Sequence, residues 1–195
     1  DGKLTAVPYS VEYKDLLGGK GANLAEMIKL GLNVPPGFTV TTEACRAYLH
    51  QGAVPDEMAA QVTEQVQNLE GKIGRTLGDP ANPLLVSVRS GARSSMPGMM
   101  ETVLDVGLCS ATIPGLIAKT GNGRFVYDAY RRLIMMYSDV VMEKAGGFEP
   151  AEGQGIRQQL DHMLEEVKET HGYVTDADIS EEHLKELCDR FKAKV

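Results

Sequence analysis

The sequence of 195 residues contains no tryptophan and only three cysteines, and it lacks several patterns that mark whole classes of protein. Cys45, Cys109 and Cys188 are far apart in an odd-numbered set without CxxC spacing, which argues against a disulfide framework or a zinc site. There is no apolar run of about 18 residues and no basic segment followed by an apolar one, so we expect neither a membrane span nor a signal peptide. These features are typical of a protein of the reducing cytoplasm.

Positive charge is also scarce. The chain has 20 Lys and Arg against 27 Asp and Glu, a net charge of −7, which disfavours nucleic-acid binding. The excess of acidic residues is concentrated near the C-terminus. Residues 146–195 carry 6 basic and 12 acidic side chains, whereas residues 1–145 carry 14 basic and 15 acidic ones. The nearly neutral first part can therefore receive a polyanion, and the acidic tail cannot.

One stretch, residues 84–102, combines a strand pattern with a cationic loop. The run from Leu84 to Val88 is short, apolar and β-branched, which predicts a buried strand. Arg89 and Arg93 follow at once among serines and glycines, and a guanidinium offers a planar fork that fits phosphate oxygens. The methionines of residues 96–100 suggest a loop that packs on a neighbouring lobe or closes over a ligand. The arginine string by itself is as typical of a surface turn as of a phosphate site.

A second cationic motif lies near the N-terminus, where residues 16–23 read LLGGKGAN. Glycines on both sides of Lys20 allow positive φ and a close approach of the backbone to a ligand. The apolar spacing predicts a helix over residues 22–30, so Lys20 would lie at a helix start, where N–H groups and the dipole favour anions. The motif is not the Walker pattern, and on its own GGKG favours a flexible turn over a ligand site.

The remaining pattern predicts an α+β fold of helices and short strands. We expect strands over 7–13, 38–41 and 102–106, helices over 42–50, 55–73, 113–119 and 124–144, a Gly-rich linker over about 146–155, and two helices beyond it. The 124–144 helix places Phe125, Leu133 and three further apolar residues on one side. It also carries Arg131 and Arg132, which are either a solvated pair or a pair with one guanidinium turned inward toward phosphate.

Four segments together resemble the pyruvate, phosphate dikinases, a family of phosphoenolpyruvate-utilising phosphotransferases. They are LLGGKGANLAEM (16–27), PPGFTVTTEAC (35–45), VSVRSGARSSMPGMMETVL (86–104) and YDAYRRLIMMYSDVVM (127–142), in the family's order. The related phosphoenolpyruvate synthases have a different loop after the arginine, so the match is to the dikinase form. The poorest fit is at residues 145–156.

This resemblance implies an ATP-grasp nucleotide domain, in which two α+β lobes hold ATP between them. The chain would then be the first lobe, an α+β unit with a small mixed or antiparallel sheet over residues 1–110, followed by a helical subdomain over 111–195. We expect the linker to lie within the helical subdomain.

The family's functional residues can be carried over to matching positions. The resemblance implies that Lys20 and Arg89 bind the ATP phosphates, and that the backbone of Gly98 and Met100 holds transferred or inorganic phosphate together with Arg132. Arg89 and Arg132 would be the catalytic cations, because phosphoryl transfer depends on positioning and charge neutralisation. No metal ligand is expected in this chain, and the Mg²⁺ ligands would lie outside it.

The resemblance also implies partners that this chain does not contain. These are the second ATP-grasp lobe, a phosphohistidine domain and a pyruvate-binding barrel, within a homodimeric enzyme that makes phosphoenolpyruvate from pyruvate, ATP and phosphate. We expect the 195-residue chain alone to be inactive. Two alternatives stay open, a part of a phosphoenolpyruvate synthase-like phosphotransferase and a nucleotide-binding module without catalysis.

Overall fold

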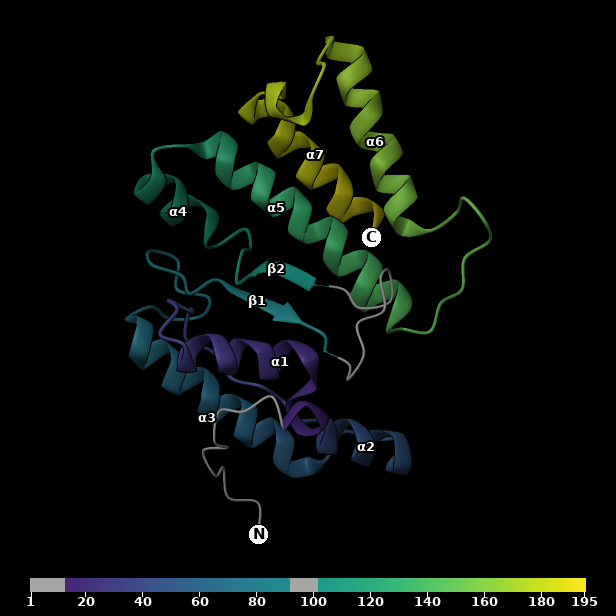
Figure 1. Cartoon of the computed structure of the whole chain (residues 1–195). Helices are drawn as coiled ribbons and strands as arrows, with labels where there is room; N and C mark the ends of the chain where they lie inside the picture. The colour runs from purple at the N-terminus through teal and green to yellow at the C-terminus, as the bar shows by residue number, and fades with distance from the viewer. Residues whose placement is uncertain (1–12, 92–101) are drawn as a thin grey trace. The chain divides into compact units, whose positions relative to one another are not determined.

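The computed structural model describes residues 13–91 and 102–195 and confirms the α+β class (Figure 1). Helices predominate, and the sheet of the described residues is one antiparallel pair of strands. The chain divides into two compact units. The first unit comprises Asp1–Gly74 and Arg89–Glu101, and the second comprises Arg75–Val88 and Thr102–Val195. The expected division between residues 110 and 111 stays a prediction.

Three helices make up most of the described part of the first unit: α1 (Lys14–Lys29), α2 (Thr42–Gln51) and α3 (Asp56–Ile73). α2 and α3 each end at a glycine with left-handed backbone, Gly52 and Gly74, which is the usual way to stop a helix. The two helices match the predicted segments closely. The strand expected over 38–41 is wrong, because this segment has no strand partner and is irregular. The strand expected over 7–13 falls almost entirely outside the described residues.

The second unit begins with the sheet and the helices that cover it. β1 (Val86–Arg89) pairs with β2 (Thr102–Val106), whose bounds are those predicted. α4 (Ile113–Thr120) and α5 (Gly123–Tyr137) then pack so that Val103, Leu116 and Tyr130 belong to one apolar cluster. The expectation that the first strand is buried is only partly right, since Leu84 is buried but Ser87 and Val88 are exposed.

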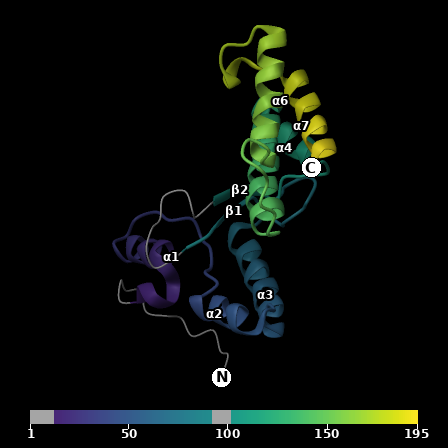
Figure 2. The ribbon, with the colours of Figure 1, turned by 90° about the vertical axis from the view of Figure 1, so that its right-hand side faces the viewer.

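A second apolar cluster joins α5 to the C-terminal helices. α5 continues into a π-helix, η2 (Ser138–Lys144), and a connection of turns and irregular backbone leads to α6 (Ile156–His171), the short 3-10 turn η3 (Asp176–Asp178) and α7 (Glu181–Lys194). Figure 2 shows α6 and α7 running side by side along this unit. Their inward residues, such as Leu160 and Phe191, are completely buried. As predicted, Ser180 caps α7, its side chain accepting a hydrogen bond from the backbone N–H of His183.

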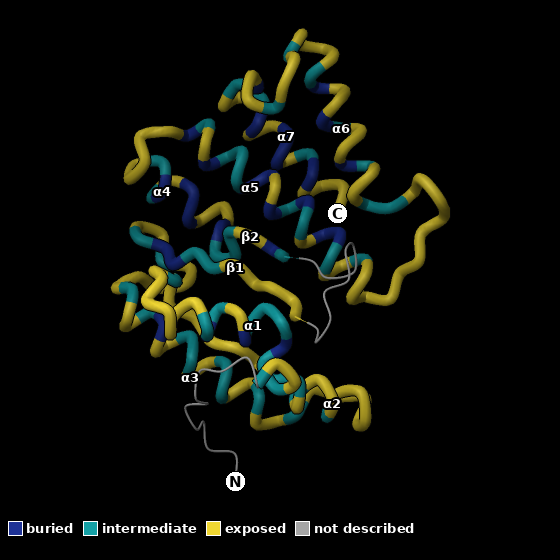
Figure 3. Tube along the Cα trace, viewed as in Figure 1, coloured by how far each residue is buried: buried dark blue, intermediate teal, exposed yellow. Residues whose placement is uncertain are grey.

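Burial is distributed unevenly over the described residues (Figure 3). Dark blue, buried positions follow α5 and α7, whereas α2 has no buried residue. None of the helices that the structure describes combines the length and apolar character needed to cross a membrane.

Candidate functional site

Lys20 lies just after a kink in α1. Gly18 has φ 68° and ψ 169°, a conformation that L side chains rarely adopt, and the helix resumes directly behind it. The residues that follow the kink form the first turn of a helical segment, where backbone N–H groups lack partners within the helix. The GGKG motif is therefore a helix start, as predicted, although helical backbone also precedes it from Lys14.

The second motif of the family, residues 35–45, packs against this turn. A Cβ atom placed on Gly21 would lie 3.2 Å from Cβ of Leu17 and 3.3 Å from both Cγ2 and Oγ1 of Thr39. A side chain at position 21 would thus crowd the 38–41 segment, which explains the glycine. The Thr42 hydroxyl also donates a hydrogen bond of 2.6 Å to the carbonyl oxygen of Asp15. Contact with α1 takes the place of the strand pairing that the sequence suggested.

Arg89 ends β1 and is exposed, and the two residues after it lead back to Lys20. A Cβ atom placed on Gly91 would lie 3.9 Å from Cβ of Lys20, so the GGKG turn and the segment following Arg89 are neighbours within the first unit. Neither Lys20 nor Arg89 forms an ion pair with any carboxylate in the part of the chain that the structure describes. Both cations can therefore receive an external anion.

Two predicted site residues, Gly98 and Met100, lie outside the described residues, and their role stays a prediction. Arg132 belongs to the second unit, on α5. Its side chain is 58% exposed and its Nη2 lies 2.9 Å from Oδ2 of Asp128. The charge of Arg132 also reaches Asp105 on β2. Burial, the larger effect, raises the pKa of the Asp105 carboxyl, and the Arg132 guanidinium lowers it.

The adjacent arginines of α5 take opposite environments. Arg131, not Arg132, is the one turned inward, with only 3% of its surface exposed. It faces carboxylates of Asp128 and Asp176. Sequence reasoning named the pair but missed both acidic partners. The spacing of Asp128, three and four residues before the arginines, could have indicated it, whereas nothing in the sequence connects Asp176 with Arg131.

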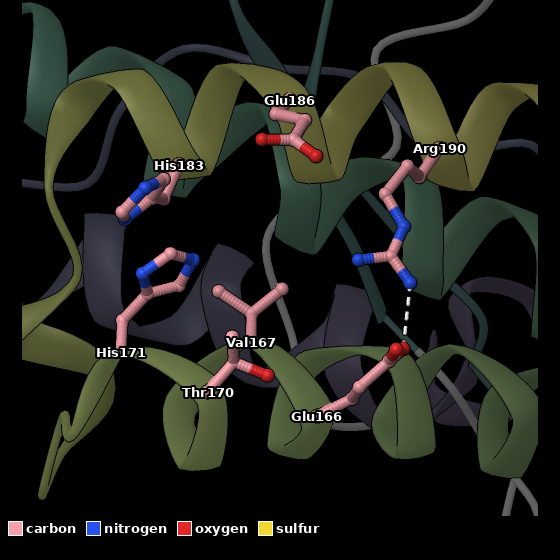
Figure 4. Close-up of a pocket in the computed structure, with 7 residues that line it drawn as sticks. All are labelled: Glu166, Val167, Thr170, His171, His183, Glu186 and Arg190. Carbon is pink, nitrogen blue, oxygen red and sulfur yellow. Dashed lines mark hydrogen bonds and ion pairs between the residues drawn. The ribbon is translucent and has the colours of Figure 1, made fainter.

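A polar hollow of about 170 Å³ lies between α6 and α7, and its lining includes none of the residues predicted to bind phosphate (Figure 4). It contains His171 and His183, whose rings are stacked with centroids 3.7 Å apart. Nδ1 of His183 is 2.8 Å from the hydroxyl of Tyr173. In the described chain no group of three or more His, Cys, Asp or Glu side chains is arranged to hold a metal ion. The hollow is lined by Glu166, Val167, Thr170, His171, His183, Glu186 and Arg190.

Comparison with known proteins agrees with the family resemblance. Residues 14–70 match the family described as "Pyruvate phosphate dikinase, AMP/ATP-binding domain". The chain is 48% identical over 181 residues to "Pyruvate, phosphate dikinase" of Clostridium symbiosum, and 48% identical over 180 residues to "Pyruvate, phosphate dikinase 1, chloroplastic" of Zea mays. It is 43% identical over 180 residues to "Pyruvate, phosphate dikinase" of Giardia intestinalis.

These alignments cover 92% of this chain but only 20%, 18% and 19% of the three relatives. The chain thus spans about a fifth of the length of the curated relatives that it matches. The resemblance to the pyruvate, phosphate dikinases, and to their nucleotide-binding part, is confirmed.

Proposed function

Because this chain is a relative of the pyruvate, phosphate dikinases, we propose that it is the nucleotide-binding part of such an enzyme and that Lys20 and Arg89 bind the phosphates of ATP. The approach of Lys20 to the segment after Arg89 is the observation that carries the proposal. It brings two motifs some 70 residues apart in sequence to one place, with both cations unpaired by the described carboxylates.

The chemistry of the two cations suits a polyphosphate. Arg89 can bind two oxygens at once with its planar fork, and Lys20 adds a point charge beside the N–H groups of a helix start. Phosphoryl transfer needs little covalent chemistry from the protein, since positioning and charge neutralisation supply most of the catalysis. In the proposal Arg132, with backbone N–H groups of Gly98 and Met100, holds transferred or inorganic phosphate.

The proposed overall reaction requires a longer enzyme, of which this chain would be one part. Phosphoryl groups pass from ATP to an enzyme histidine and to phosphate, and then to pyruvate, giving phosphoenolpyruvate, AMP and pyrophosphate. The second ATP-grasp lobe with the Mg²⁺ ligands, the phosphohistidine domain and the pyruvate barrel would come from the rest of a homodimeric, cytoplasmic enzyme. Phosphate as the second acceptor, in place of water, separates this reaction from that of phosphoenolpyruvate synthases.

Calorimetric titration with Mg·ATP tests the assignment of Arg89. We compare the chain with Arg89→Ala and, as a matched control, with Arg46→Ala, which removes an exposed arginine of α2 in the same unit. Hydrogen bonds to charged groups contribute about 1.5–3 kcal/mol. Loss of Arg89 should therefore weaken binding by about ten- to a hundredfold, and loss of Arg46 should leave it unchanged.

Equal ATP affinity in Arg89→Ala and the unaltered chain would overturn the assignment. If no variant binds ATP, the same three proteins are compared in a chain extended past Val195 to the length of the relatives, where the second lobe is present. The same contrast between Arg89 and Arg46 then decides the question.

A further inference from the structure

Arg131 and Arg132 are consecutive on α5, so they point in directions about 100° apart and cannot face the same surroundings. Arg131 points into the second unit, where 4% of its side chain is exposed. Arg132 points outward, with 58% of its side chain exposed. The buried arginine needs compensating carboxylates, because an unpaired buried charge costs several kcal/mol.

Two carboxylates compensate Arg131. Oδ1 of Asp128 accepts hydrogen bonds from Nε and Nη2 of Arg131, at 3.0 and 2.7 Å. Oδ2 of Asp176 accepts another from Nη2, at 2.8 Å. Asp176 lies in η3, between α6 and α7, and its other oxygen is 3.4 Å from Nζ of Lys168. Arg131 is thereby fixed between α5 and the C-terminal helices.

Asp128 is shared between the two arginines. Its Oδ1 is held by Arg131, while its Oδ2 lies 2.9 Å from Nη2 of Arg132. Only 14% of the Asp128 side chain is exposed, and both hydrogen bonds from Arg131 end on its Oδ1, so that oxygen is held in place. With Oδ1 held, Oδ2 has less freedom to move, and a charge-assisted bond to it restrains the guanidinium of Arg132 in turn.

We propose that Asp128 and Asp176 are positioning residues, and that the relay Asp176–Arg131–Asp128 holds the guanidinium of Arg132 in one orientation for a phosphate group. The phosphate role of Arg132 rests on the proposed function, whereas the relay itself consists of contacts within the second unit. α6 and α7 carry no predicted site residue. In this proposal they nevertheless influence the orientation of Arg132, through Asp176 in the segment that connects them.

The advantage of the relay is preorganisation. A free arginine side chain loses about 2 kcal/mol of rotamer entropy when it is immobilised, and a group already held in place loses less of it on binding. The ion pair uses one terminal nitrogen, and a guanidinium has five N–H donors, so donors remain for an anion. Because more than half of the Arg132 side chain is exposed, its ion pair with Asp128 contributes only modestly to holding the guanidinium in place.

The test uses the 195-residue chain and nitrogen NMR of the arginine side chains. The variants are Asp128→Asn, Asp176→Asn and Arg132→Gln, and the control is Glu166→Gln, which removes an ion pair between α6 and α7 outside the relay. Rotation of the Arg132 guanidinium is measured first, and the same signals then follow a titration with inorganic phosphate. Thermal unfolding of each variant separates lost stability from lost positioning.

Asp128→Asn and Asp176→Asn should both speed rotation of the Arg132 guanidinium and weaken phosphate binding about fivefold, a factor equivalent to about 1 kcal/mol. Glu166→Gln should change neither. The relay is overturned if Asp176→Asn alters the signals of Arg131 while the rotation of Arg132 stays as in the unaltered chain. A purely structural role would lower the unfolding temperature and leave rotation unchanged.

Phosphate binding separates this inference from the proposed function. If Arg132→Gln binds phosphate as the unaltered chain does, or if phosphate leaves the Arg132 signals unmoved, the phosphate role of Arg132 fails. The rotation rates in Asp128→Asn and Asp176→Asn still decide whether the relay positions Arg132.

Discussion

The two compact units of this chain differ in how far their apolar side chains are covered. Of the buried apolar residues in the described part of the chain, Ala22, Ala25 and Leu69 belong to the first unit and all the others to the second. In the first unit Leu30 and Leu49 are 70% and 75% exposed, while in the second Leu160 and Phe191 are wholly buried.

The second unit supplies most of the described apolar core, whereas the first unit carries two of the candidate phosphate-binding cations. The second unit has two continuous clusters that join its helices and its sheet, and burial of this kind is the main source of folding free energy. The first unit carries Lys20 and Arg89 on a helix start and a strand end, with little described core behind them. Among the described residues of the first unit, apolar surface that stays uncovered is typical of a contact face.

The largest contrast is expected from one leucine in each unit. Leu160→Ala should lower the stability of the second unit by about 3–4 kcal/mol, because it removes a completely buried side chain and leaves a cavity. Leu49→Ala should change the first unit by less than about 0.5 kcal/mol, because its side chain is already in water. Amide hydrogen exchange, followed separately in peptides of α6 and of α2, measures both.

Equal losses of stability in Leu160→Ala and Leu49→Ala would contradict the difference in burial between the two units. A large effect of Leu49→Ala in a longer chain, together with a small one here, would instead identify α2 as part of a contact face. Leu164→Ala, at another buried position of α6, checks that the effect of Leu160 is due to burial.

A matched pair of threonines gives the next contrast. Thr112 is completely buried, and its hydroxyl oxygen accepts a hydrogen bond of 2.9 Å from the backbone N–H of Cys109 and lies 3.1 Å from the carbonyl oxygen of Gly107. Thr112→Val keeps the shape but leaves these groups unpaired, at a cost of about 1–3 kcal/mol. Thr42→Val removes one exposed hydrogen bond to Asp15 and should cost less than about 1 kcal/mol. Urea unfolding of both variants checks the order, which equal losses would contradict.

Local pattern predicted most elements, and it predicted the buried face of α6 and α7 correctly but that of α5 only in part. The strand over 102–106 and the helix beginning at Ile113 agree with the structure because their apolar spacing and flanking glycines act locally. On α5 the predicted stripe included Phe125, yet Phe125 is 57% exposed and its neighbour Val126 is buried. α5 is covered by β2, α4, α6 and α7, and tertiary contacts of this kind decide which face is inside.

In the candidate site, too, the types of residue could be predicted from the sequence but their contacts could not. Lys20 and Arg89 could be selected from sequence because the types of residue that bind phosphate are few and both stand at element ends. The closeness of Gly91, two residues after Arg89, to Lys20 could not be predicted, since it depends on how α1 and the segment after β1 pack. The link from Asp176 to Arg131 was beyond prediction for the same reason, since 45 residues separate the two.

The smallest expected effect concerns Asp105, a half-buried acid of the second unit with left-handed backbone at φ 57°. Burial raises the pKa of its carboxyl above the usual 3.8, and Arg132 only partly offsets this. A raised folded-state pKa means that the stabilising contribution is complete below pH 3.8 and is lost as the pH rises through the folded value. Asparagine also tolerates this backbone but has no charge to bury.

Asp105→Asn should therefore be more stable than the unaltered chain at pH 7, by about 0.5 kcal/mol, and the difference should vanish below pH 3.8. Chemical unfolding at a series of pH values measures it, with Glu64→Gln on the exposed side of α3 as the control from the first unit. If Asp105→Asn is instead less stable at pH 7, attraction to Arg132 outweighs burial. Arg132 would then have a second carboxylate partner, and the packing of β2 against α5 would owe more to charge than to apolar contact.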